Sequence, residues 1–215
     1  MFGISIVFAH GFGVRADARG MFTDIAKAMP EANCITFDFN TFDSEGNTTV
    51  TPLDGQVAIL QSHIDKAQEG ATLICHSQGC IVAGLANLDK IGQVIFLAPP
   101  PEISIKRFMQ KFGTREGSVM NLDGLSSIPR SDGSTTYIPK EYVESIKSID
   151  VPSLYKKVAN SHELTIVRAT KDNILGKTNF DYLENVKIID IPADHDFTGG
   201  SRAVLVNSVK KILES

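Results

Sequence analysis

Residues 71–80 read ATLICHSQGC. The apolar run ATLICH predicts a buried strand, and the small and apolar residues over 79–88 predict a tightly packed helix. Only Ser77 and Gln78 remain to connect the two elements. The stretch therefore predicts a strand that passes through a sharp turn directly into a helix.

Short apolar runs alternate with longer helical patterns along the rest of the chain. Strands are predicted at residues 3–9, 33–39, 71–76, 93–98, 164–169 and 186–191. Apolar side chains at helical spacing predict helices that begin near residues 21, 54, 79 and 202. This alternation is typical of βαβ units, so we expect an α/β fold with a mostly parallel sheet of about six strands flanked by helices.

The pattern changes between the fourth and fifth predicted strands. Three prolines at positions 99–101 open a long insertion, which contains a predicted amphipathic helix at 105–112, a turn at 131–133 and a helix at 141–149. Insertions of this length in a compact domain often serve function. We expect residues 99–160 to form a cap or lid on a core made of residues 1–98 and 161–215; a decorative extension packed on the sheet is the alternative.

Composition excludes several classes of protein. The chain has 215 residues, 42% of them hydrophobic and 21% charged, with a formal net charge of −4. This charge argues against binding to nucleic acid, and no apolar segment reaches the length of a membrane span. The start MFGISIVFAHGFG is expected to be a core strand and not a signal peptide, so we expect a cytoplasmic protein that acts on a small molecule.

Polar residues with catalytic chemistry follow several of the predicted strands. In parallel sheets, ligands bind beyond the carboxyl ends of the strands. The residues at those ends are the His10-Gly11-Phe12-Gly13 run, Ser77, Asp172 and His195. A serine hydroxyl becomes an effective nucleophile when an imidazole accepts its proton and a carboxylate orients that imidazole. All three types of side chain are present, in the chain order Ser, Asp, His.

These motifs resemble those of the α/β-hydrolase fold superfamily. Residues 75–79, CHSQG, match its Gly-x-Ser-x-Gly nucleophile turn, except that Cys75 replaces the first glycine. The resemblance implies that Ser77 is the nucleophile, Asp172 the acid and His195 the base. The His-Gly run implies that the backbone N–H groups of Phe12 and Gln78 bind the oxyanion.

Other candidates for the base, the acid and the nucleophile are weaker. The remaining histidines are His10 in the oxyanion loop, His63 within a helix, His76 beside the serine with its side chain expected to point away, and His162 before the fifth strand. Asp123 and Asp150 lie in the insertion. Cys75 and Cys80 flank the turn and are expected to be small core residues, and the three cysteines do not predict a disulfide framework.

The resemblance implies a serine hydrolase that cleaves a small carboxylic ester through an acyl-enzyme intermediate, without a cofactor or metal. Thioesterase, peptidase, lipase or cofactor-free haloperoxidase activity on the same residues stays open, as does a non-catalytic ligand-binding protein of this fold. A nucleotide-binding α/β protein is disfavoured, because the loop after the first strand lacks the dinucleotide fingerprint. Candidate acyl-pocket residues are Phe108, Met109, Phe112 and Tyr137.

Overall fold

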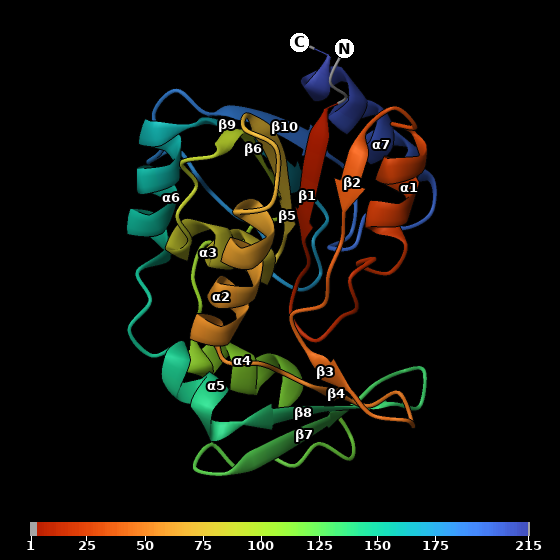
Figure 1. Cartoon of the computed structure of the whole chain (residues 1–215). Helices are drawn as coiled ribbons and strands as arrows, with labels where there is room; N and C mark the ends of the chain where they lie inside the picture. Colours follow the sequence, from red (N-terminus) through yellow and green to blue (C-terminus); the bar gives the residue numbers. More distant parts are fainter. Residues whose placement is uncertain (1–3, 215) are drawn as a thin grey trace.

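A computed structural model describes residues 4–214, and its centre is a sheet of six parallel strands. The order across the sheet is β10-β9-β6-β5-β1-β2 (Figure 1). The bounds of the strands are β1 Ser5–Ala9, β2 Asn33–Ile35, β5 Ala71–His76, β6 Ile91–Leu97, β9 Glu163–Ala169 and β10 Lys187–Ile191. The predicted fold class is confirmed. The predicted start of the first strand at residue 3 lies outside the described residues.

Helices cover both faces of this sheet, which explains why its central strands are apolar on both sides. One face packs against α1 (Met21–Lys27) and α7 (Gly200–Leu213), and the other against α2 (Leu53–Ile64), α3 (Gln78–Leu85) and α6 (Val151–Ser161) (Figure 1). All six residues of β5 are buried. Its side chains alternate between the two cores, with Leu73 in one and Ile74 in the other.

A second, smaller sheet lies beyond the carboxyl ends of the central strands (Figure 1). Its order is β3-β4-β8-β7, with the bounds β3 Thr41–Phe42, β4 Thr48–Thr49, β7 Leu125–Pro129 and β8 Thr135–Pro139. Strands β7 and β8 form an antiparallel hairpin around the predicted turn at 131–133. The insertion thus pairs with residues 48–49 of the polar loop after β2, a pairing that the sequence did not predict.

Three helices belong to the region between β6 and β9. The helix α4 (Ile105–Phe112) has the predicted bounds, whereas α5 (Lys140–Ser145) ends four residues before the predicted residue 149. The third, α6, was not predicted, although Asp150 caps it and Pro152 lies in its first turn. It packs so closely on α3 that a Cβ on Gly84 would lie 2.9 Å from that of Leu154. The division at residues 99 and 160 stays a prediction.

Within residues 4–214, none of the helices combines the length and the apolar character needed to cross a membrane.

Candidate active site

Ser77 forms the sharp turn between β5 and α3. Its backbone angles are φ 52° and ψ −123°, and a non-glycine residue in such a conformation stores about 1–3 kcal/mol of strain. The surrounding backbone holds it there, because its N–H donates to the carbonyl of Leu97 at 3.0 Å and its own carbonyl accepts from the N–H of Cys80 at 3.0 Å. The serine is thus fixed at the tip of the turn, where it lines a cavity.

Two glycines allow the turn to approach the end of β1. A Cβ on Gly79 would lie 2.2 Å from the carbonyl oxygen of Ala9 and 2.7 Å from that of His10. A Cβ on Gly11 would lie 3.0 Å from that of Ser77. Both contacts of Gly79 are with rigid backbone atoms, so position 79 admits no side chain without displacing β1 or α3.

Cys75, where the resemblance would place glycine, fits within the core. Its side chain is fully buried on the face of β5 that packs against α2, α3 and α6, so it does not meet the β1 loop. The Sγ–H of Cys80 donates to the Cys75 carbonyl at 3.5 Å. Burial raises the pKa of both thiols well above the ordinary value, so both are unreactive at neutral pH.

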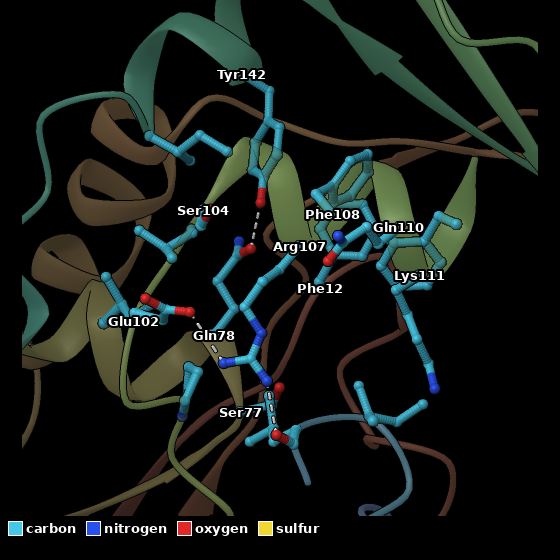
Figure 2. A pocket seen from close by; sticks show the side chains of 17 residues that line it. Phe12, Ser77, Gln78, Glu102, Ser104, Arg107, Phe108, Gln110, Lys111 and Tyr142 are labelled. Carbon is cyan, nitrogen blue, oxygen red and sulfur yellow. Dashed lines mark hydrogen bonds and ion pairs between the residues drawn. The ribbon is translucent and has the colours of Figure 1, made fainter. Parts of the chain in front are cut away.

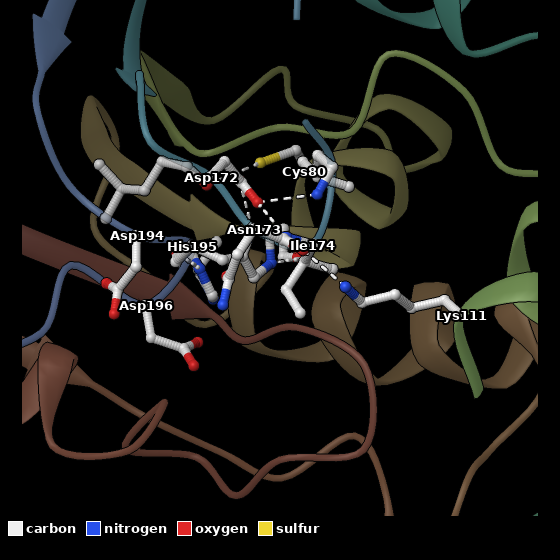
Figure 3. A network of polar contacts seen from close by, with 12 residues as sticks. Cys80, Lys111, Asp172, Asn173, Ile174, Asp194, His195 and Asp196 are labelled. Carbon is white, nitrogen blue, oxygen red and sulfur yellow. Dashed lines mark hydrogen bonds and ion pairs between the residues drawn. The ribbon is translucent and has the colours of Figure 1, made fainter. Parts of the chain in front are cut away.

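Ser77, His195 and Asp172 form a continuous hydrogen-bonded chain, of which His195 and Asp172 are labelled in Figure 3. The Ser77 hydroxyl lies 2.9 Å from Nε2 of His195, and Nδ1 of His195 lies 2.7 Å from Oδ2 of Asp172. His195 follows β10 and Asp172 follows β9, so three segments far apart in the sequence meet at one edge of the sheet. The arrangement places the Nδ1 proton on the side of Asp172 and leaves Nε2 free to accept the serine proton.

The carboxylate of Asp172 is held in its ionised form. Burial alone would raise the pKa of Asp172, but the hydrogen bond and charge interaction with His195 and two backbone N–H groups outweigh burial and lower it. The two N–H groups, from Ile174 and Leu175, donate to Oδ1 at 2.8 and 2.7 Å. One oxygen therefore fixes the carboxylate in its loop, and the other orients the imidazole.

Phe12 and Gln78 are the residues expected to bind the oxyanion through their backbone N–H groups. Both residues line the same cavity as Ser77. Among the backbone hydrogen bonds of residues 4–214 outside the regular helices and strands, none uses the N–H of Phe12 or of Gln78. Gln78 is the first residue of α3, where the first N–H groups have no partner within the helix. Both donors are therefore available to a bound molecule.

A buried network of side chains, not predicted from the sequence, fixes Gln78; Figure 2 shows its contact with Tyr142. Its Nε2 donates to Oε1 of Gln56 at 2.9 Å, and its Oε1 accepts from the hydroxyl of Tyr142 at 2.5 Å. Gln56 in turn donates to the carbonyl of Thr51 at 2.6 Å. A polar Gln56 on the buried face of α2 is the one sequence signal of this network, which joins the core to α5.

The serine opens into an apolar cavity of about 330 Å³ (Figure 2). The ring of Phe12 lies between three aromatic rings, at centroid distances of 5.4 Å from Phe108, 5.8 Å from Phe112 and 5.5 Å from Tyr142. Of the four predicted pocket residues, Phe108 and Phe112 line this cavity, whereas Met109 and Tyr137 are not among its lining residues. Helix α4 therefore supplies one wall.

Polar contacts connect α4 to the loop that carries Asp172. Nη2 of Arg107 donates to the carbonyl of Leu175 at 2.7 Å, while Nη1 pairs with Glu102 at 3.0 Å (Figure 2). Nζ of Lys111 donates to the carbonyl of Asn173 at 2.5 Å (Figure 3). The helix over the cavity is thus anchored directly beside the acid.

His76, which was expected to point away from the Ser77 side chain and to take no part in the site, contacts the proposed base. Its ring is buried against that of His195, with a centroid distance of 5.0 Å, and its Nε2–H donates to the His195 backbone carbonyl at 3.0 Å. Burial, and then the nearby His195, lower the pKa of His76 to about 4. A neutral His76 therefore supports the loop of His195 and is unsuited to act as a base at neutral pH.

The remaining candidates take no part in the chain from Ser77 through His195 to Asp172. They are placed as follows: His10 donates to Gly11 and accepts from Phe39, His63 stacks on Phe37, His162 contacts the carbonyl of Leu88, Asp150 caps α6 and Asp123 lies in the loop before β7. Within the described part of the chain, no group of three His, Cys, Asp or Glu side chains is arranged to hold a metal ion.

Comparisons with known proteins agree with the fold of the chain. The model of the Alpha/beta hydrolase family matches residues 6–171. An esterase domain from a Rhodothermus marinus protein has a TM-score of 0.63 at 18% identity, covering 96% of this chain and 84% of that chain. Est1E from Butyrivibrio proteoclasticus has a TM-score of 0.67 at 16% identity, covering 98% and 87%.

A thermophilic esterase from Thermogutta terrifontis has a TM-score of 0.65 at 15% identity, covering 99% of this chain and 90% of that chain. No curated protein matches the sequence. The family match spans more than half of the chain, from β1 through β9, and the structural similarities extend over nearly all of it. The chain therefore belongs to the alpha/beta hydrolase family and is a hydrolase.

Proposed function

We propose that the protein cleaves small carboxylic esters by nucleophilic catalysis, with Ser77 as nucleophile, His195 as general base and Asp172 as the group that orients and stabilises the imidazolium. The observation that carries the proposal is the hydrogen-bonded chain from Ser77 Oγ through His195 to Asp172, at 2.9 and 2.7 Å, which opens on an apolar cavity. This is the arrangement that acyl transfer requires.

In the first half of the reaction, Nε2 of His195 takes the proton of Ser77 as Oγ attacks the carbonyl carbon. The negative charge that develops on the carbonyl oxygen is stabilised by the N–H groups of Phe12 and Gln78. His195 then gives the proton to the leaving alcohol, and an acyl-serine remains. The hydrogen bonds from Ile174 and Leu175 keep Asp172 charged while the imidazolium exists.

In the second half, the same Nε2 accepts a proton from water, which attacks the acyl-serine, and the carboxylic acid leaves. The network from Gln56 to Tyr142 keeps the start of α3 in place, so the Gln78 N–H does not move between the two steps. The cavity of about 330 Å³ limits the group beside the carbonyl to a short or medium chain. Its aromatic wall favours an apolar one.

Hydrolysis of 4-nitrophenyl esters from acetate to decanoate tests this proposal. We expect turnover by the wild type that is greatest for short acyl chains, and loss of turnover in Ser77→Ala, His195→Ala and Asp172→Asn. A series of matched thioesters and anilides, measured on the same protein, separates esterase from thioesterase and peptidase activity. If the wild type cleaves none of these compounds, the catalytic proposal fails and a ligand-binding role takes its place.

A further inference from the structure

A second cavity has a volume of about 570 Å³. Its lining includes Gly13, the residue directly after Phe12. Its lining also includes four arginines. Arg15 and Arg19 lie in the loop after β1, Arg115 follows α4, and Arg130 directly follows β7. The acidic residues in the lining are Asp17 and Asp132. We call this site the arginine cavity. Positive charge exceeds negative charge there, although the whole chain has a formal charge of −4.

Arg130 occupies the least exposed position among these charges and has no carboxylate partner. Its Nε donates to the hydroxyl of Thr136 at 2.6 Å and its Nη2 to the carbonyl of Gly13 at 3.3 Å, and both acceptors are neutral. Among the ion pairs of residues 4–214, none includes Arg130. Burial, together with repulsion from Arg19 and Arg115, lowers the pKa of Arg130 to about 10.

The local acidic groups are already engaged with other partners. The carboxylate of Asp132 accepts from the N–H and hydroxyl of Ser134 at 3.0 and 2.7 Å. That of Asp17 accepts from the backbone N–H of Arg19 at 3.2 Å. A partly buried guanidinium that lies among like charges is unfavourable unless an anion joins it. The cavity is therefore complementary to an anionic group from outside the chain.

The arginine cavity adjoins both loops that the proposed mechanism uses. Arg130 contacts Gly13 directly after the Phe12 N–H donor, and its guanidinium lies 6.0 Å from the centre of the Phe12 ring. Arg19 forms an ion pair at 2.8 Å with Asp196, the residue after His195. A molecule whose carbonyl lies at the serine could therefore extend past Phe12 to reach these arginines.

We propose that the arginine cavity binds an oxyanionic group, a carboxylate or a phosphate, carried by the ester substrate. This inference rests on the proposed esterase function, because it assigns the anion to the molecule that Ser77 cleaves. The planar fork of a guanidinium pairs with two oxygens of either group at once, which a lysine cannot reproduce. The apolar cavity would then hold the acyl side of the ester, and the arginine cavity would hold the charged end of its alcohol side.

Binding is tested without catalysis in the Ser77→Ala protein. Inorganic phosphate and succinate are titrated separately by calorimetry, at low and high sodium chloride, so that the two arms distinguish the two kinds of anion. We expect saturable binding of at least one anion that weakens with salt, and an additional loss of about tenfold in affinity when Arg130→Met or Arg115→Met is introduced. Arg115 is exposed, so its variant keeps the test valid if Arg130→Met folds poorly.

Lys66→Met is the matched control, since it removes one exposed positive charge before β5, at the opposite end of the sheet. Its anion affinity should equal that of the parent protein. Absence of saturable binding of both anions, or equal weakening by Lys66→Met and Arg115→Met, would overturn the inference. An Arg130→Lys protein that binds as tightly as the parent would also contradict the role given to the guanidinium fork.

A kinetic comparison then ties the cavity to the substrate. The ratio of kcat/KM for 4-acetoxybenzoate, whose carboxylate lies on the alcohol side of the ester, to that for methyl 4-acetoxybenzoate is measured in each protein. Arg115→Met should lower this ratio about tenfold and Lys66→Met should leave it unchanged. An unchanged ratio in Arg115→Met overturns the substrate role even if esters are cleaved. If no ester is cleaved but phosphate binds at the arginines, the esterase proposal fails and the anion site stands.

Discussion

The Nε2–H of His76 donates to the backbone carbonyl of His195 at 3.0 Å, and the two rings lie 5.0 Å apart. The residue before the serine and the proposed base are thereby connected directly, although 119 positions separate them in the sequence. His76 is a positioning residue in this arrangement, since it contacts the loop of the base and not the reacting atoms.

Replacing His76 should lower kcat with little change in KM. Loss of the hydrogen bond in His76→Ala frees the His195 loop and should reduce kcat for a 4-nitrophenyl ester roughly tenfold. His76→Gln retains an N–H donor and should recover part of the loss. If KM rises while kcat is unchanged, or if both variants are equally impaired, His76 has only a packing role.

Acid should destabilise the protein over a pH range that is set by the pKa of His76. The pKa of His76 is about 4 in the folded state, below the value of about 6.5 expected in the unfolded chain. The unfolded state therefore binds the proton more tightly, and the free energy of unfolding should fall as the pH decreases from about 6.5 to about 4. This contribution is fully present above about pH 6.5, with an upper value of about 3 kcal/mol.

Urea denaturation of wild type and His76→Gln at several pH values measures this contribution. The difference in unfolding free energy between the two proteins should change between pH 6.5 and 4 and be constant above pH 7. A difference that does not depend on pH would contradict a neutral, buried His76. The comparison subtracts the other titrating groups, including Asp172, which are common to both proteins.

The turn between β5 and α3 should not accommodate a side chain at position 79. The Cβ of Gly79→Ala would meet backbone oxygens of Ala9 and His10 at 2.2 and 2.7 Å, and displacing β1 or α3 should cost about 3 kcal/mol or more. Gly200→Ala is the matched control, because a Cβ at that position in α7 meets nothing within 4 Å. Thermal unfolding should show a large loss for the first variant and none for the second.

Cys75→Gly should restore the usual glycine of the motif at a cost in stability. It removes a fully buried thiol and adds backbone freedom within β5, which should cost about 2 kcal/mol. Because the Cys75 side chain faces the core and not the β1 loop, ester turnover should remain close to that of the wild type. Loss of turnover in a folded Cys75→Gly protein would show that the thiol shapes the turn.

Much of the fold could be predicted because local pattern and tertiary structure agree in it. The central strands are buried on both faces and therefore read as apolar runs, and the intervening helices have apolar stripes. The meeting of Ser77, Asp172 and His195 was predictable for the same reason, since each follows a parallel strand and those ends share one edge. Their hydrogen bonds, by contrast, are known only from the structure.

The smaller sheet could not be predicted, because long-range pairing determines it. Thr48 and Thr49 form a strand of two residues only through their partners Thr136 and Tyr137, and no periodicity can be detected in so short a segment. The helix α6 did carry a local signal that was missed, namely Asp150 as its cap followed by Pro152. The arginine cavity also depends on contacts between distant segments.

The orientation of His76 illustrates a second limit. Alternation along a strand predicts the face on which a side chain lies, but not what packs on that face. The side chain of His76 lies on the face of β5 opposite to that of Cys75, as expected. On that face it contacts the loop after β10. The Gln78 network was hidden for a related reason, because its partners Gln56 and Tyr142 come from α2 and from the insertion.

Covalent labelling by a fluorophosphonate, read by intact mass and peptide mapping, tests the central claim most directly. The wild type should gain one adduct, located on Ser77, and Ser62→Ala, which changes an exposed serine on α2, should label equally. Ser77→Ala should not label, and His195→Ala should label far more slowly because the base is missing. An unlabelled wild type, or equal labelling of Ser77→Ala, would contradict Ser77 as the nucleophile.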